Sequence, residues 1–132
     1  MYSSVIRDYG DESSFEIDET LPLPELKSNQ VLVKISASSI NPIDLMKREG
    51  YGRSIFEKQR RNNFPWILGS DFSGHVVSVG QKVTRFKEGD EVWGCTSKAS
   101  SGTYAEYAAI DQEEVNIKPK NLTFEEAASL PY

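Results

Sequence analysis

The chain has 132 residues, of which 15 are basic and 20 acidic, so its formal net charge is −5. This length suits one domain with its own core, and the hydrophobic (38%) and charged (27%) fractions are ordinary for a globular protein. The acidic balance argues against a nucleic-acid partner, because basic side chains supply most of the affinity for phosphates. No apolar run is long enough to span a bilayer, and the N-terminus lacks the pattern of a secretory signal. The single cysteine, Cys95, excludes an internal disulfide and a four-cysteine zinc site.

Short strand-like runs, separated by turn residues, dominate the chain. The run 14–21 ends at a Leu-Pro-Leu-Pro segment, and 71–79 carries Gly74 where a bulge or a close backbone approach would fall. Residues 91–95 and 101–110 predict further strands. In 30–38, period-two patterning places four residues on one face: Val31, Val33, Ile35 and Ala37. The pattern predicts a mainly β fold, a mostly antiparallel barrel or sandwich with short helices.

A first helix is predicted after Asn41. Asn41 is a good N-cap, and Pro42 stands at the first helical position, where its missing N–H costs nothing. Asp44 falls in the first turn, where a carboxylate favours the helix dipole. Gly50 is a suitable C-terminal stop.

A second helix is predicted from Thr123, which forms a capping-box pattern with Glu126. That helix runs toward Leu130 and meets Pro131. A domain rarely ends on a helix that has just begun. We therefore expect the full protein to continue beyond residue 132.

Five segments together carry a family resemblance: VLVKISASSINPIDLMKREGYG, FPWILGSDFSGHVVSVG, FKEGDEVWG, GTYAEYAAI and KPKNLTFEEAASLPY. In this order they resemble the N-terminal catalytic domain of medium-chain dehydrogenase/reductases. The resemblance is strongest to the quinone-oxidoreductase branch and its reticulon-interacting mitochondrial group. It implies a GroES-like, partly open β-barrel over residues 1–132, followed in the intact protein by a Rossmann domain that binds NADPH. No G-x-G-x-x-G run occurs in this chain.

The same resemblance bears on zinc. Zinc-dependent members carry a cysteine where this chain has Asn41, and a histidine where it has Ser70. An amide and a hydroxyl do not replace the thiolate and imidazole ligands of a catalytic zinc. We therefore expect no metal, and a reductase of this kind must polarise its substrate through hydrogen-bond donors.

The resemblance also implies candidate site residues. Tyr51 matches the tyrosine that related enoyl reductases place near the substrate carbonyl, and Asn41 matches an asparagine near the nicotinamide. Asn41 and Tyr51 are thus the candidate catalytic residues, and with Asp44 the candidate cofactor-binding residues. Ser70 and Asp71 are expected to line the substrate cleft. The amide of Asn41 can donate and accept, so it could hold either the carboxamide or the substrate oxygen.

Each candidate also has a purely structural interpretation, which for Tyr51 is that of an ordinary loop tyrosine. Asn41 is explained locally as a helix cap and Asp44 as a favourable first-turn residue. Ser70 and Asp71 suit a turn before a strand. His75, in the middle of a strand, is interpreted as a packed or surface histidine. Cys95 is interpreted as a small core residue, since free cysteine is often buried.

Two functions from different classes remain open. The first is an NADPH-dependent, zinc-independent reductase of quinones or activated alkenes, a homodimer when intact, whose isolated 132-residue part is inactive. The second is a non-catalytic interaction module with a reticulon-type protein partner. The basic segment 53–66 is either a surface loop or a lid that meets an anionic partner. The resemblance implies a mitochondrial location, with a cytoplasmic one as the alternative.

Overall fold

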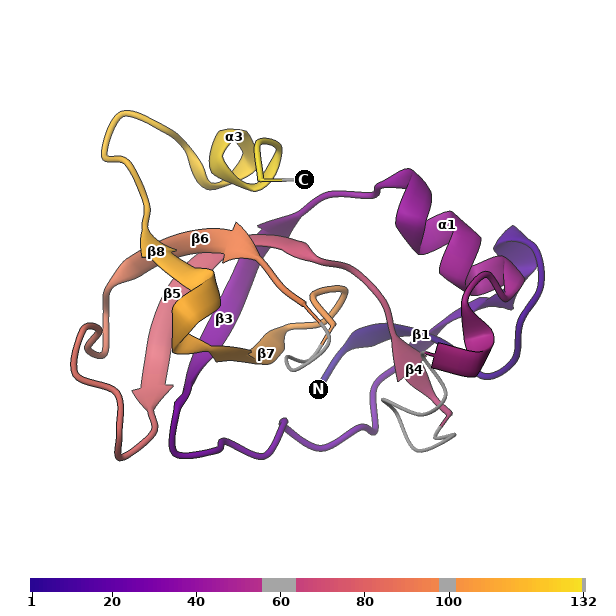
Figure 1. The fold of residues 1–132 in the computed structure, drawn as a ribbon, viewed down its shortest axis with the longest axis horizontal. Helices are drawn as coiled ribbons and strands as arrows, with labels where there is room; N and C mark the ends of the chain where they lie inside the picture. The colour runs from indigo at the N-terminus through magenta and orange to yellow at the C-terminus, as the bar shows by residue number, and fades with distance from the viewer. Residues whose placement is uncertain (56–63, 98–101, 132) are drawn as a thin grey trace.

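The computed structural model describes residues 1–55, 64–97 and 102–131. Its strands form two antiparallel sheets, in the orders β2-β1-β4 and β7-β3-β5-β6-β8 (Figure 1). The smaller sheet contains β1 (Ser3–Ile6), β2 (Phe15–Asp18) and β4 (Trp66–Ile67). The larger sheet contains β3 (Gln30–Ser38), β5 (Asp71–Val79), β6 (Glu91–Cys95), β7 (Tyr107–Asp111) and β8 (Val115–Ile117). Neither sheet closes into a full barrel among the described strands.

The larger sheet holds the main apolar core. Branched residues on β3 and β5 are favoured in strands and pack here with aromatic and small side chains from the neighbouring segments. Phe72 is fully buried. The rest of the cluster is Val31, Val33, Val76, Val83, Phe86, Val92, Ala108, Ile110 and Val115. This face is therefore held by burial of apolar surface.

Several predicted strands match the structure to the residue, namely β3, β5 and β6. The predicted face of 30–38 is confirmed for Val31 and Val33, whereas Ile35 and Ala37 are only half-buried. The pairing shifts between Ile35 and Ala37, opposite Gly74. A Cβ on Gly74 would meet the carbonyl oxygen of Lys34 at 2.0 Å. The expected close backbone approach at Gly74 is therefore confirmed.

Other boundaries differ from the predictions. The strand predicted at 14–21 is shorter, since β2 ends at Asp18, and the one predicted at 101–110 begins only at Tyr107. The sequence patterns missed β1, β4 and β8. They also missed the two short 3-10 turns η1 (Glu12–Ser14) and η2 (Gln112–Glu114), which Asp11 and Asp111 cap. Strands of two to four residues are too short for a period to stand out.

Both predicted helices are present. Helix α1 (Pro42–Glu49) follows β3 and lies at the end of the molecule occupied by the smaller sheet (Figure 1). Helix α3 (Phe124–Ala128) lies over the larger sheet and contacts β3, β5 and β6. Its capping box is formed as predicted, because Thr123 Oγ1 accepts from the Glu126 N–H at 3.1 Å and Glu126 accepts from the Thr123 N–H at 3.0 Å.

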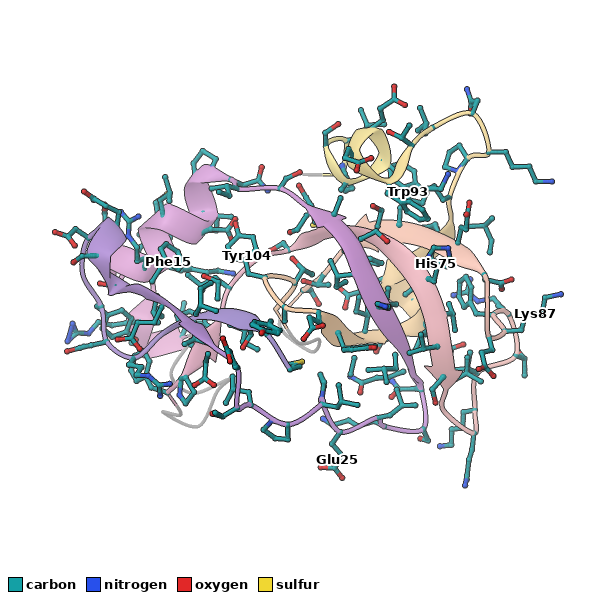
Figure 2. The ribbon with its side chains drawn as sticks, turned by 180° about the vertical axis from the view of Figure 1, so that it is seen from behind. Phe15, Glu25, His75, Lys87, Trp93 and Tyr104 are labelled. Atoms are coloured by element: carbon teal, nitrogen blue, oxygen red, sulfur yellow. The ribbon has the colours of Figure 1, made fainter. Side chains whose placement is uncertain are left out.

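The basic segment 53–66 falls mostly on residues 56–63, outside the described residues, so its two interpretations stay predictions. His75 is a surface histidine, as interpreted. Its Nε2 lies 3.6 Å from the Glu91 carboxylate, and its ring lies 4.9 Å from the ring of Phe124. Figure 2 shows His75 and Trp93 at the end of the molecule near α3. Within the described residues, no helix has the length and apolar character needed to cross a membrane.

Candidate functional site

The start of α1 is organised around Asn41. Its backbone is extended (φ −117°, ψ 158°), and its carbonyl accepts the Asp44 N–H at 3.0 Å. In return, the Asn41 N–H donates to Asp44 Oδ2 at 3.0 Å. These bonds satisfy two groups that a helix start otherwise leaves open. The predicted N-cap at Asn41 is confirmed.

Asp44 is fully buried, and three donors from different elements reach its carboxylate. Besides the Asn41 N–H, these are the Gly69 N–H at 3.2 Å and the Tyr104 hydroxyl at 2.8 Å. Burying a carboxylate is costly unless donors compensate it. Asp44 therefore ties α1 to the segment before β5 and to the segment before β7, which is more than the favourable dipole contact expected from the sequence.

Tyr104 is the residue that sequence reasoning missed in this network. Burial first, and then the hydrogen bond to Asp44, raise the pKa of its phenol far above the ordinary value. Its ring lies 6.5 Å from the ring of Phe15, and Figure 2 shows both at the end of the molecule that carries α1. The only sequence signal was a tyrosine two residues after a glycine in Gly102-Thr103-Tyr104, which does not identify a partner.

Asp71, at the start of β5, is 1% exposed. Its Oδ2 accepts the side-chain Nδ2 of Asn41 at 2.9 Å, whereas Oδ1 has no hydrogen-bond partner among the described residues. Ser70 is also buried, and its carbonyl accepts the Thr96 N–H at 2.8 Å. Both residues are thus buried, and Asp71 contacts Asn41. Their role in lining a cleft stays a prediction.

Cys95 was interpreted as a small core residue. In the structure it is only half-buried, so it is not part of the fully buried core. The register of β5 and β6 places it directly opposite Asp71. Burial first, and then the neighbouring Asp71 carboxylate, raise the pKa of the thiol to about 11. The thiol is therefore protonated near neutral pH and is a weak nucleophile.

Lys47 is a second residue that the sequence interpretation passed over. It stands three residues after Asp44, so the two side chains share a face of α1. Burial lowers the pKa of its ammonium, while attraction by Asp44 and then Cys95 opposes that change. The site thus combines two buried carboxylates with a half-buried cation.

Tyr51 lies away from this network. It follows the far end of α1, is 59% exposed, and donates its backbone N–H to the Met46 carbonyl at 2.8 Å. The flanking Gly50 and Gly52 have φ of 103° and 67°, which side-chain-bearing residues rarely adopt. An eight-residue helix is about 12 Å long, so the structure does not bring Tyr51 against Asn41. Its catalytic role stays a prediction.

An apolar pocket of about 580 Å³ lies beside the network and is lined by residues of β1 and β2 together with Ile35 of β3. Tyr104 and Ile40 connect it to the start of α1. The remaining lining comes from Tyr2, Ser3, Ser4, Phe15, Ile17, Ile35, Ala105 and Glu106. Among the described residues, no group of three His, Cys, Asp or Glu side chains could hold a metal ion.

Residues 27–120 match the model of the alcohol dehydrogenase GroES-like domain. The chain belongs to this family. The expected GroES-like fold is confirmed, since the chain aligns with the quinone oxidoreductase of Coxiella burnetii with a TM-score of 0.89 and 36% identity, covering 99% of this chain and 41% of that one. It also aligns with the Escherichia coli quinone oxidoreductase complexed with NADPH, with a TM-score of 0.84 and 25% identity over 98% of this chain and 37% of that one.

Two curated relatives extend the comparison. The mitochondrial NAD(P)H oxidoreductase RTN4IP1 of Dictyostelium discoideum is 38% identical over 133 residues, covering 100% of this chain and 37% of that protein. The chloroplastic NADPH-dependent alkenal/one oxidoreductase of Arabidopsis thaliana is 36% identical, covering 99% of this chain and 34% of that protein. The chain therefore spans little more than a third of the length of these relatives. Both relatives are named as oxidoreductases that use a nicotinamide cofactor.

Proposed function

We propose that this chain is the substrate-side domain of an NADPH-dependent, zinc-independent oxidoreductase that reduces quinones or activated alkenes. The observation that carries the proposal is similarity over essentially the whole chain to proteins named NAD(P)H oxidoreductase and alkenal/one oxidoreductase. The relatives named mitochondrial support a mitochondrial location. Homodimerisation of the intact protein and a reticulon-type partner stay predictions.

The residues present fit the nicotinamide end of the cofactor and not its phosphates. The chain has no glycine-rich dinucleotide motif, so we assign the phosphates to the part of the intact protein outside this chain. Asn41, anchored between two carboxylates, is a rigid polar group at the edge of the network. Rigid groups of this kind orient a ring without paying the entropy of ordering a side chain.

When bound, the nicotinamide supplies the hydride; the protein supplies orientation and electrostatics. Tyr51, exposed between two glycines, offers a phenol that can donate to a substrate oxygen while its ring covers an apolar face. Zinc independence is supported by Asn41 and Ser70, which do not provide the cysteine and histidine ligands of the zinc-dependent members.

The test uses the full-length protein. We expect NADPH to bind with a change in its fluorescence, and quinones or enones to be reduced at a rate that a zinc chelator does not alter. The isolated 132-residue chain is the matched control and should show no turnover. A full-length protein that binds no NADPH and reduces none of these substrates would overturn the proposal, and activity lost to the chelator would overturn its zinc-independent part.

A further inference from the structure

Helix α3 is held at both of its ends by serine hydroxyls from other segments. At its start, the Phe124 carbonyl accepts from the hydroxyl of Ser73 on β5 at 2.6 Å. At its end, the Ala128 carbonyl accepts from the hydroxyl of Ser39 at 2.5 Å, where the segment between β3 and α1 runs past the helix (Figure 1). The last carbonyls of a helix have no partner within it, so the Ser39 hydroxyl supplies one. The two serines therefore hold the same short helix through the same kind of bond.

Ser39 differs from Ser73 in what its backbone contacts. The Ser39 carbonyl lies 3.1 Å from the Tyr104 hydroxyl, which also lies 2.8 Å from Asp44 Oδ2. The backbone of Ser73 instead pairs with β3 and β6 within the larger sheet. Ser39 thus contacts α3 through its side chain and the buried network at the start of α1 through its backbone.

The Tyr104 hydroxyl has one proton and two acceptors within reach. Directed at Asp44, it is one of three donors to a buried carboxylate. Directed at the Ser39 carbonyl, it leaves Asp44 with two backbone N–H donors. A charged acceptor forms the stronger bond, so Asp44 holds the proton in the present arrangement. A displacement of Ser39 moves the competing carbonyl, and two discrete arrangements of this kind are what coupling between separate sites requires.

We propose that Ser39 is a positioning residue that couples the end of α3 to the start of α1, so that a displacement of the helix changes which acceptor the Tyr104 hydroxyl serves. Any part of the intact protein that follows residue 132 is joined to this chain through α3. The proposed function assigns the phosphates of NADPH to a part outside this chain. That nucleotide bound there acts on Asp44 through Ser39 rests on the proposed function, whereas the coupling itself does not.

The first test measures hydrogen exchange in the full-length protein without nucleotide. The N–H groups of Asn41 and Gly69 both donate to the Asp44 carboxylate, so their exchange rates report how firmly it is held. Ser39→Ala should raise both rates roughly fivefold, the equivalent of one ordinary hydrogen bond. Ser39→Thr keeps a hydroxyl and should stay within about twofold of the original rates.

The matched control is Ser73→Ala, which removes the corresponding bond at the other end of α3. It should raise exchange at the Ala127 N–H, which donates within α3, and leave the Asn41 and Gly69 rates within about twofold of the original. Unchanged rates in Ser39→Ala would overturn the coupling. So would a Ser73→Ala variant in which the Gly69 rate rises as much as in Ser39→Ala.

A second test asks whether the effect passes through Tyr104. Tyr104→Phe keeps the ring and removes the hydroxyl, so by itself it should raise exchange at the Gly69 N–H. Adding Ser39→Ala to this variant should raise the rate by less than about twofold more, because changes along one path do not add. An equal effect of Ser39→Ala in both backgrounds would show that Ser39 acts elsewhere, and the inference would be wrong.

The last test adds 2′-phospho-ADP-ribose, which has the phosphates of NADPH and lacks the nicotinamide ring. A response at the Asn41 and Gly69 N–H groups then passes through the protein rather than through the ring. The compound should lower both exchange rates roughly threefold in the unaltered protein and in Ser73→Ala, and much less in Ser39→Ala. Binding with the same response in the two variants would contradict the role of Ser39. Failure to bind would instead contradict the proposed function, and the tests without nucleotide would still decide the coupling.

Discussion

The molecule has two buried regions that are held together in different ways. The core of the larger sheet consists of apolar side chains on its five strands and in the connection between β5 and β6, with Phe72 fully buried among them. One residue earlier, at the start of β5, Asp71 is buried and accepts a hydrogen bond from Asn41, the N-cap of α1. The apolar core depends on area and volume, which many side chains could supply. The polar network depends on particular donors and acceptors, and a change of one atom alters it.

The largest expected effect is in the apolar core. Phe72→Ala should lower the free energy of unfolding by about 3–5 kcal/mol, because it removes a fully buried ring and leaves a cavity. Denaturant unfolding measures it, and Ile117→Ala is the control, since Ile117 is 55% exposed and should cost much less. Equal losses for the two variants would mean that Phe72 is not part of a close-packed core.

Asp44→Asn should lower the free energy of unfolding less than Phe72→Ala does. Its effect should be concentrated at the start of α1. It is nearly isosteric, yet it turns one acceptor oxygen into a donor facing the N–H of Asn41 or Gly69, or the Tyr104 hydroxyl. We expect a loss of about 2–3 kcal/mol in the free energy of unfolding, as for other buried groups left unpaired.

The matched control is Asp8→Asn, an exposed carboxylate whose Oδ1 accepts only the neighbouring Tyr9 N–H within the described part of the chain. It should change the free energy of unfolding by no more than about 0.5 kcal/mol. Hydrogen exchange at the first turn of α1 should rise in Asp44→Asn and not in the control. A loss of stability without faster exchange there would show that Asp44 does not act through α1.

The same contrast explains how far the sequence could predict the structure. Regular patterns are visible in sequence, so β3, β5, β6 and the caps at Asn41 and Thr123 were predicted correctly. The polar network is assembled from segments far apart in the chain, as in the bond between Asp44 and Tyr104. No local pattern records such a pair, and only the fold brings it together.

The candidate site likewise combines features that the sequence showed with contacts that only the fold reveals. The resemblance identified Asn41, Asp44 and Asp71, and in the structure Asn41 donates a hydrogen bond to each of the two carboxylates. It could not reveal that Asp71 contacts Asn41 with one oxygen unpartnered in the described residues. Nor could it reveal Tyr104, since a tyrosine in a loop carries no signal of its partner.

The smallest expected effect is on the acidity of Cys95, where the two regions meet. Burial and the facing Asp71 raise the pKa of this thiol to about 11, so its thiolate fraction near pH 8 should be roughly a hundredfold below that of an ordinary cysteine. Alkylation by iodoacetamide should therefore be slow at pH 8 and rise steeply only toward about pH 11. Because the pKa is raised on folding, the stability it contributes is complete below about pH 9, the usual range of an unfolded thiol, and is lost as the pH rises through about 11.

Asp71→Asn should speed alkylation at pH 8, since it removes one cause of the raised pKa but not the burial, which is the larger one. An alkylation profile centred near about pH 8.5 in the unaltered protein would mean that Cys95 is not held beside Asp71, and the contact between the polar network and β6 would then have to be reconsidered.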